Sequence, residues 1–142
     1  MRRRRRLAVA VLAAALAAGA SGCAPATTPD PALVLLVQDA LSATRTAQLD
    51  LGLVVDDRVL GTSSDVVLSD MAEALATTGQ ELELHLAAAP ADDAYRDEAL
   101  DAVRDALGGI RVAREGDAAE GLRRVDDAAD VLAALDAEGG ES

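Results

Sequence analysis

Two side chains in this sequence could carry chemistry by themselves, the thiol of Cys23 and the imidazole of His85. Each is the single residue of its kind in the 142-residue chain. Without a second cysteine the thiol cannot form an internal disulfide. The imidazole could bind a metal or carry a proton if neighbouring groups supplied further ligands or oriented the ring.

Cys23 follows a segment with the three parts of a secretory signal peptide. Residues 2–6 are arginines, residues 7–18 form an apolar run, and residues 19–22 are small. The apolar run is shorter than the roughly 20 residues that a helix needs to span a bilayer. We therefore predict that residues 1–22 direct export and are then removed.

The residues Ala20-Ser21-Gly22-Cys23 resemble the lipobox of bacterial lipoproteins. The resemblance implies that a peptidase cuts between Gly22 and Cys23 after the Cys23 thiol has received a diacylglyceryl group. It departs from the family pattern at Ala20, where leucine is preferred. Two alternatives remain open. One is cleavage after Ala20, which would release a protein with an unpaired thiol, and the other is export through a twin-arginine motif at residues 4–8.

The lipobox resemblance also implies a location, the extracytoplasmic face of the cell membrane. Two acyl chains on Cys23 would hold the protein there, because two chains resist dissociation where one does not. Residues 23–29 are small and uncharged and contain two of the four prolines. We predict that they form a tether of at most about 25 Å.

Composition limits the possible partners of the part that follows the cleavage site. Residues 23–142 contain 8 arginines against 25 acidic residues, a net charge of −17. This charge disfavours binding to nucleic acid and flat adsorption on anionic lipid. The chain has one aromatic residue, Tyr95, so stacking on sugars or bases is also disfavoured.

Four segments carry apolar or small residues at alternating three- and four-residue steps, which is typical of helices that share a core. We predict helices over about residues 30–56, 62–89, 92–113 and 117–138. A short strand at residues 53–55 is an alternative end for the first segment. The expected buried positions are Leu33, Val37, Ala40, Thr44, Ala47, Leu51 and Val54; Leu68, Met71, Leu75, Thr78, Leu82, His85 and Ala89; Tyr95, Ala99, Leu100, Val103, Ala106, Leu107, Ile110 and Ala113; and Leu122, Val125, Ala129, Leu132 and Leu135.

Local signals refine these boundaries. Thr62 and Asp65 match a capping pattern at the end of a loop over residues 57–64, and Pro90 should end the second helix. Gly108-Gly109 predicts a bend or fraying in the third helix. Tyr95 is expected at the end of the bundle with its hydroxyl in water.

These segments predict an all-α protein, an antiparallel up-down-up-down four-helix bundle over residues 30–138, followed by a disordered tail over residues 139–142. Together with the lipobox, this pattern resembles the uncharacterised helical-bundle lipoproteins of high-GC Gram-positive bacteria. The resemblance implies the fold and the location, but no activity.

Known cofactor and catalytic patterns do not fit these residues. A single histidine is a poor start for zinc. Met71 and His85 would lie about 21 Å apart on one helix, too far to share a haem iron. EF-hand, Glu-x-x-His and G-x-S-x-G patterns are absent. We therefore predict no cofactor and no enzymatic activity, although Glu81 could orient His85 in a metal or proton site.

Two further clusters leave alternatives open. Arg111, Arg114, Arg123 and Arg124 could form a basic docking patch or a set of ion pairs with nearby acids, for which Glu120–Arg124 has the favourable spacing, as does Asp92–Arg96. Thr44, Thr78 and His85 could line a polar slot for a small ligand or metal. We expect a structural or interaction role with an unknown envelope protein, and the slot is the alternative.

Overall fold

The computed structural model describes residues 28–59 and 61–140, and this part of the chain is entirely helical. It contains α2 (Pro31–Val55), α3 (Gly61–Leu84), α4 (Pro90–Arg114) and α5 (Ala118–Gly140), with no strand. The all-α prediction is therefore confirmed. The predicted signal segment, the cleavage point between Gly22 and Cys23 and most of the tether lie outside the described residues.

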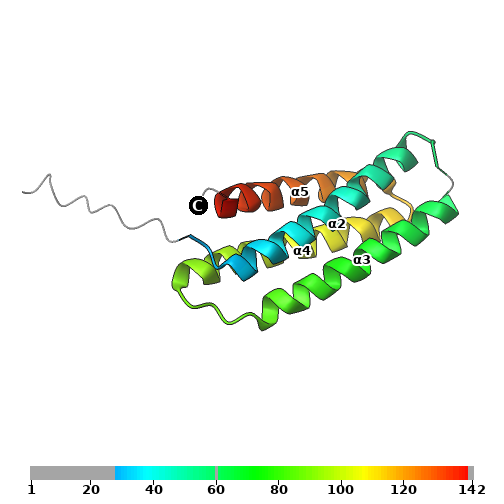
Figure 1. Cartoon of the computed structure of the whole chain (residues 1–142). Coiled ribbons are helices and arrows are strands. Elements are labelled where there is room, and N and C mark those ends of the chain that lie inside the picture. Colours follow the sequence, from blue (N-terminus) through cyan, green and yellow to red (C-terminus); the bar gives the residue numbers. More distant parts are fainter. Residues whose placement is uncertain (1–27, 60, 141–142) are drawn as a thin grey trace, which may run out of the picture.

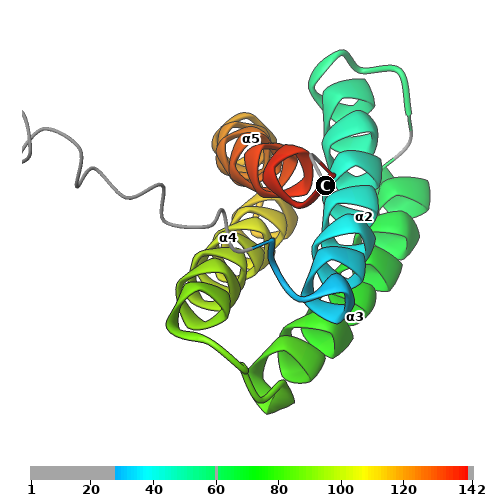
Figure 2. The ribbon, with the colours of Figure 1, turned by 60° about the vertical axis from the view of Figure 1, so that its left-hand side comes forward.

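The four helices lie side by side, as Figure 1 shows. α2 and α4 each pack against both α3 and α5, and they also touch one another across the middle. Residues 28–30 lead into α2 at the end where the α3–α4 connection lies, called the proximal end below (Figures 1 and 2). The α2–α3 and α4–α5 connections lie at the opposite end, called the distal end.

The core is aliphatic and follows the predicted helical spacing. Positions expected to be buried are closed to solvent in all four helices, among them Leu33, Val37, Leu51, Leu75, Leu82, Val103, Ile110, Val125 and Leu132. A few expected positions, including Val54, Met71, Leu107 and Leu122, are half-buried. The spacing therefore identified the correct face of each helix.

α4 continues without interruption through Gly108 and Gly109, so the predicted fraying is wrong. Gly109 instead lies against Gly121 of α5. A Cβ atom added at Gly109 would lie 2.9 Å from the Gly121 carbonyl oxygen, and one added at Gly121 would lie 2.7 Å from the Gly109 oxygen. The two glycines allow α4 and α5 to approach each other more closely than side chains would permit.

The limits of α3 differ from the prediction at both ends. The helix already begins at Gly61, so Thr62 lies inside its first turn and does not cap it. It ends at Leu84, and Pro90 starts α4 instead of ending α3. At the end of α2, the helix persists to Val55, so the alternative strand at residues 53–55 is wrong.

α5 continues two residues past its predicted end, to Gly140. A Cβ atom at Gly139 would lie 2.7 Å from Cγ2 of Val34, which shows how closely the end of α5 approaches the start of α2. Residues 139–140 of the predicted tail are thus helical. Residues 141–142 lie outside the described part of the chain.

Tyr95 is buried, contrary to the expectation that its hydroxyl would lie in water. It is 5% exposed, and its hydroxyl donates a hydrogen bond of 3.1 Å to the carbonyl oxygen of Leu135. The hydroxyl thus links α4 to the last turns of α5. Burial, and then the negative charges of Asp136 and Glu138, raise the pKa of Tyr95 from 10.0 to about 12.

We expect this raised pKa to make the protein less stable as the pH rises from 10 towards 12. In that range the unfolded chain has lost the Tyr95 proton and the folded chain still holds it, so alkali favours unfolding. Tyr95→Phe should remove this part of the pH dependence. Because Tyr95 is the only tyrosine, tyrosinate absorbance reports it directly. Ionisation at the same pH in folded and denatured protein would contradict the prediction.

Candidate functional site

A polar cluster at the proximal end joins the start of α2 to the α3–α4 connection. We call Asp30, His85, Asp92 and Arg96 the proximal cluster. His85 Nε2 lies 3.2 Å from Oδ2 of Asp30, and the backbone N–H of Asp30 donates to Oδ1 of Asp92 at 3.1 Å. Arg96 Nη1 donates to the carbonyl oxygen of His85 at 3.2 Å. These contacts hold the point where the chain enters α2 against the loop before α4.

Each member of the proximal cluster is placed by a helix end. Asp30 is the N-cap of α2, and its Oδ1 accepts from the backbone N–H of Ala32 at 2.8 Å. Asp92 lies in the first turn of α4 and is 7% exposed. Arg96 forms ion pairs with Asp93 and Asp97 instead of the predicted Asp92.

The spacing of the sequence places His85 on the buried face of α3, but in the structure His85 lies just beyond the end of this helix. The helix ends one residue earlier, and the ring turns to Asp30 on another element instead of Glu81. Its side chain is 18% exposed. Among the described residues, no group of three or more histidine, cysteine or acidic side chains could hold a metal ion. The contacts of the proximal cluster join the start of α2 to the α3–α4 connection and to α4.

The predicted polar slot does not come together. The hydroxyl of Thr44 donates to the Ala40 carbonyl oxygen, and that of Thr78 donates to the Ala74 carbonyl oxygen, so each is satisfied within its own helix. Thr44 lies 13 residues beyond Pro31, about 20 Å along α2 from the end that His85 touches. His85 and Thr44 therefore cannot contact one small ligand.

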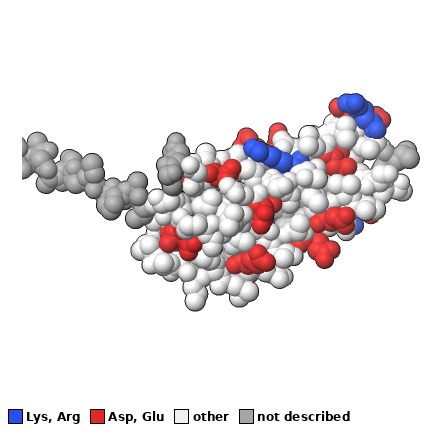
Figure 3. All heavy atoms as spheres, viewed as in Figure 1, with Lys and Arg blue, Asp and Glu red and all other residues white. Residues whose placement is uncertain are grey.

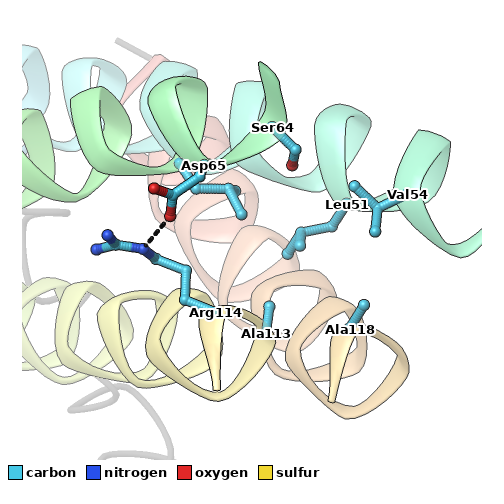
Figure 4. A pocket seen from close by; sticks show the side chains of 8 residues that line it. Leu51, Val54, Ser64, Asp65, Ala113, Arg114 and Ala118 are labelled. Carbon is cyan, nitrogen blue, oxygen red and sulfur yellow. Dashed lines mark hydrogen bonds and ion pairs between the residues drawn. The ribbon is translucent and has the colours of Figure 1, made fainter. Parts of the chain in front are cut away.

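A pocket of about 300 Å³ opens at the distal end, between the ends of all four helices (Figure 4). Its lining is mostly apolar, and Arg114 Nε and Asp65 Oδ1 form an ion pair of 2.8 Å at its edge. Ser64 also faces the pocket, but its hydroxyl donates to Asp50 of α2. The lining residues are Leu51, Val54, Ser64, Asp65, Leu68, Ala113, Arg114 and Ala118.

The sequence pattern does not predict this distal pocket, because it places Ser64 in a loop and Asp65 in the capping pattern that ends the loop. Its volume is at the lower limit of pockets that bind small molecules. The lining offers one hydroxyl and one ion pair, and His85 lies at the opposite end of the helices. The pocket could accept a small apolar group, and its one hydroxyl, that of Ser64, is bonded to the carboxylate of Asp50.

The alternative of ion pairs one helical turn apart is confirmed for Arg123 and Arg124, while Arg114 forms an ion pair with another helix. Arg114 pairs with Asp65 of α3, and Arg123 and Arg124 both pair with Glu120 at 2.8 Å. Hydrogen bonds from Arg123 and then Arg124 lower the pKa of Glu120 to about 2. Arg111 is exposed. Most of the predicted basic patch is therefore neutralised by neighbouring acids.

Comparison with known proteins finds no relative of this chain. No protein family model matches the chain, and neither a curated protein nor a solved structure matches it. Within the described residues, none of the helices combines the length and the apolar character needed to cross a membrane.

Proposed function

We propose that this protein is a lipoprotein, held by lipid on Cys23 at the extracytoplasmic face of a cell membrane, that acts by binding another envelope protein. The observation that carries the proposal is the order of segments at the N-terminus, with arginines, an apolar run, small residues and then the single cysteine. Residues 28–30 lead into α2 at the proximal end of the helices. A tether from Cys23 would therefore hold the helical body by this end.

In this proposal the body is an up-down-up-down four-helix bundle. The α2–α3 and α4–α5 connections share the distal end and the α3–α4 connection lies at the proximal end, as expected for helices that alternate in direction (Figure 1). Short connections between neighbouring helices favour the same topology. The bundle would serve as a rigid body that presents its surface away from the membrane.

The negative charge of the surface favours a binding partner with basic residues. Acidic groups are spread along the face drawn in Figure 3. Between α2 and α3, a groove of about 680 Å³ is lined by Asp39, Asp70, Glu73 and Glu81, and no basic residue lines it. None of these four carboxylates has an ion-pair partner within the described residues. Such a surface attracts a cationic partner and repels nucleic acid.

The anchoring part of the proposal is tested by labelled palmitate. We expect the label to enter the wild-type protein, and we expect a Cys23→Ala variant to be unlabelled and to appear in the medium. Asp39→Ala, a change on the exposed surface of α2, serves as a control that should keep both the label and the membrane fraction. An unlabelled wild-type protein would refute lipid anchoring.

The interaction part is tested by crosslinking in intact cells. A triple variant of the groove, Asp70→Asn with Glu73→Gln and Glu81→Gln, should lose most of any crosslinked partner. A matched variant, Glu98→Gln with Asp105→Asn and Asp130→Asn, removes the same charge from other exposed positions and should keep the partner. Equal loss in both variants would show that the groove does not select the partner.

A further inference from the structure

We infer that the α3–α4 connection touches the membrane directly, by placing Leu84 and Leu86 among the lipid acyl chains. This inference rests on the proposed lipid anchor and gives the anchored body a second contact with the same bilayer. The kind of partner is a lipid surface, and the contact is apolar. The contact would fix how the helices are oriented above the membrane.

Exposure of these two side chains is the first observation. Leu84 is 80% exposed and Leu86 is 91% exposed, the two highest values for large apolar side chains in the described residues. Leu84 ends α3 and Leu86 lies in the connection, which continues through the alanines at residues 87–89. Exposed apolar residues next to each other often mark a site of contact with a membrane or a partner.

The position of the connection is the second observation. His85 lies between the two leucines, and its contacts with Asp30 at 3.2 Å and with Arg96 at 3.2 Å keep the connection beside the start of α2. The leucines are therefore presented from the end where the chain enters the helices (Figures 1 and 2). Both leucines therefore lie at the proximal end.

The reach of the chain is the third observation. Cys23 precedes the first described residue, Thr28, by five positions. Five residues span at most about 18 Å even when fully extended. Acyl chains on Cys23 would thus keep the proximal end near the bilayer, and the connection with Leu84 and Leu86 lies at that end. A distant partner protein has no comparable reason to meet this loop.

Charge next to the connection does not oppose the contact. The Asp30 carboxylate lies against His85, and Asp92 is almost fully buried and accepts from a backbone N–H. Glu83, beside Leu84, pairs with Arg104 at 3.1 Å. These partners reduce the charge that the loop would bring to the lipid surface. In the groove between α2 and α3, by contrast, the lining carboxylates lack ion-pair partners among the described residues.

The experiment uses tryptophan as a depth probe, since the natural chain has none. The lipidated protein is purified from the producing cells as L86W and placed in phosphatidylcholine vesicles with brominated or ordinary acyl chains. We expect brominated lipid to quench the L86W emission at least two-fold. L84W should also be quenched, while L49W, at a site on α2 that is 72% exposed, should not.

The outcomes separate this inference from the anchor. Palmitate in the protein with equal quenching of L86W and L49W would overturn the membrane contact and leave the anchor standing. Protection of L86W from an aqueous quencher in cell envelopes, without quenching by brominated lipid, would also overturn it in favour of a protein contact. If no palmitate is incorporated, both proposals fail. Circular dichroism of each variant should match the wild-type spectrum.

Discussion

Gly121→Ala is expected to lower the free energy of unfolding by about 2–3 kcal/mol, because it adds a methyl group where α4 and α5 are in backbone contact. The new Cβ atom would lie 2.6 Å from Cβ of Ala113 and 2.7 Å from the carbonyl oxygen of Gly109. Neither atom belongs to a flexible side-chain end that could turn away. The helices would have to separate, which would loosen the packing of Val125 beside the contact.

Gly108→Ala is the matched control for this change. Gly108 lies in the same helix as Gly109, and a Cβ atom there would meet nothing within 4 Å. Alanine at an open helical position is favoured over glycine by about 1 kcal/mol, so this variant should be slightly more stable. Denaturant unfolding of both variants measures the difference. Equal effects of the two substitutions would contradict the close approach of α4 and α5.

Leu75→Ala should cost about 3–4 kcal/mol of unfolding free energy, because it opens a cavity under the middle of α3. Leu75 is fully buried. The large buried side chains of α3 are Leu68, Leu75 and Leu82, which recur every seven residues along the helix. Loss of the central one therefore weakens the attachment of the whole helix, and amide hydrogen exchange in α3 should increase more than in α5.

The control for this substitution lies in the same helix. Leu84→Ala changes an identical side chain that is 80% exposed, so its effect on unfolding in solution should stay within about 0.5 kcal/mol. Urea titrations of the two variants at one pH supply the comparison. A cost below about 1 kcal/mol for Leu75→Ala would show that α3 is held by contacts other than this row of leucines.

The helices could be predicted from the sequence because each one buries a single face. The steps of three and four residues from Leu33 to Leu51 place these side chains on one side of α2, where they are fully buried. The same rule located the buried faces of α3, α4 and α5. The core of the described residues is aliphatic apart from Tyr95.

What the sequence pattern missed depends on contacts between distant residues. The spacing from Leu82 to His85 fits a continuing helix, but His85 turns to Asp30, 55 positions away. Gly108-Gly109 indicates a break when only neighbouring residues are considered. The glycine at position 109 is instead explained by its contact with Gly121 on the next helix. The distal pocket likewise requires residues from four helices to meet. Local propensity carries no information about such partners.

The two described ends of the chain lie together, since Gly139 of α5 packs against Val34 of α2. A reporter domain fused after the C-terminus would consequently sit at the same end as residues 28–30. The turn over residues 115–117 lies at the other end, between α4 and α5. An epitope grafted into this turn would stand at the distal end of the molecule, opposite the end where the chain enters α2 and where a fused reporter would sit.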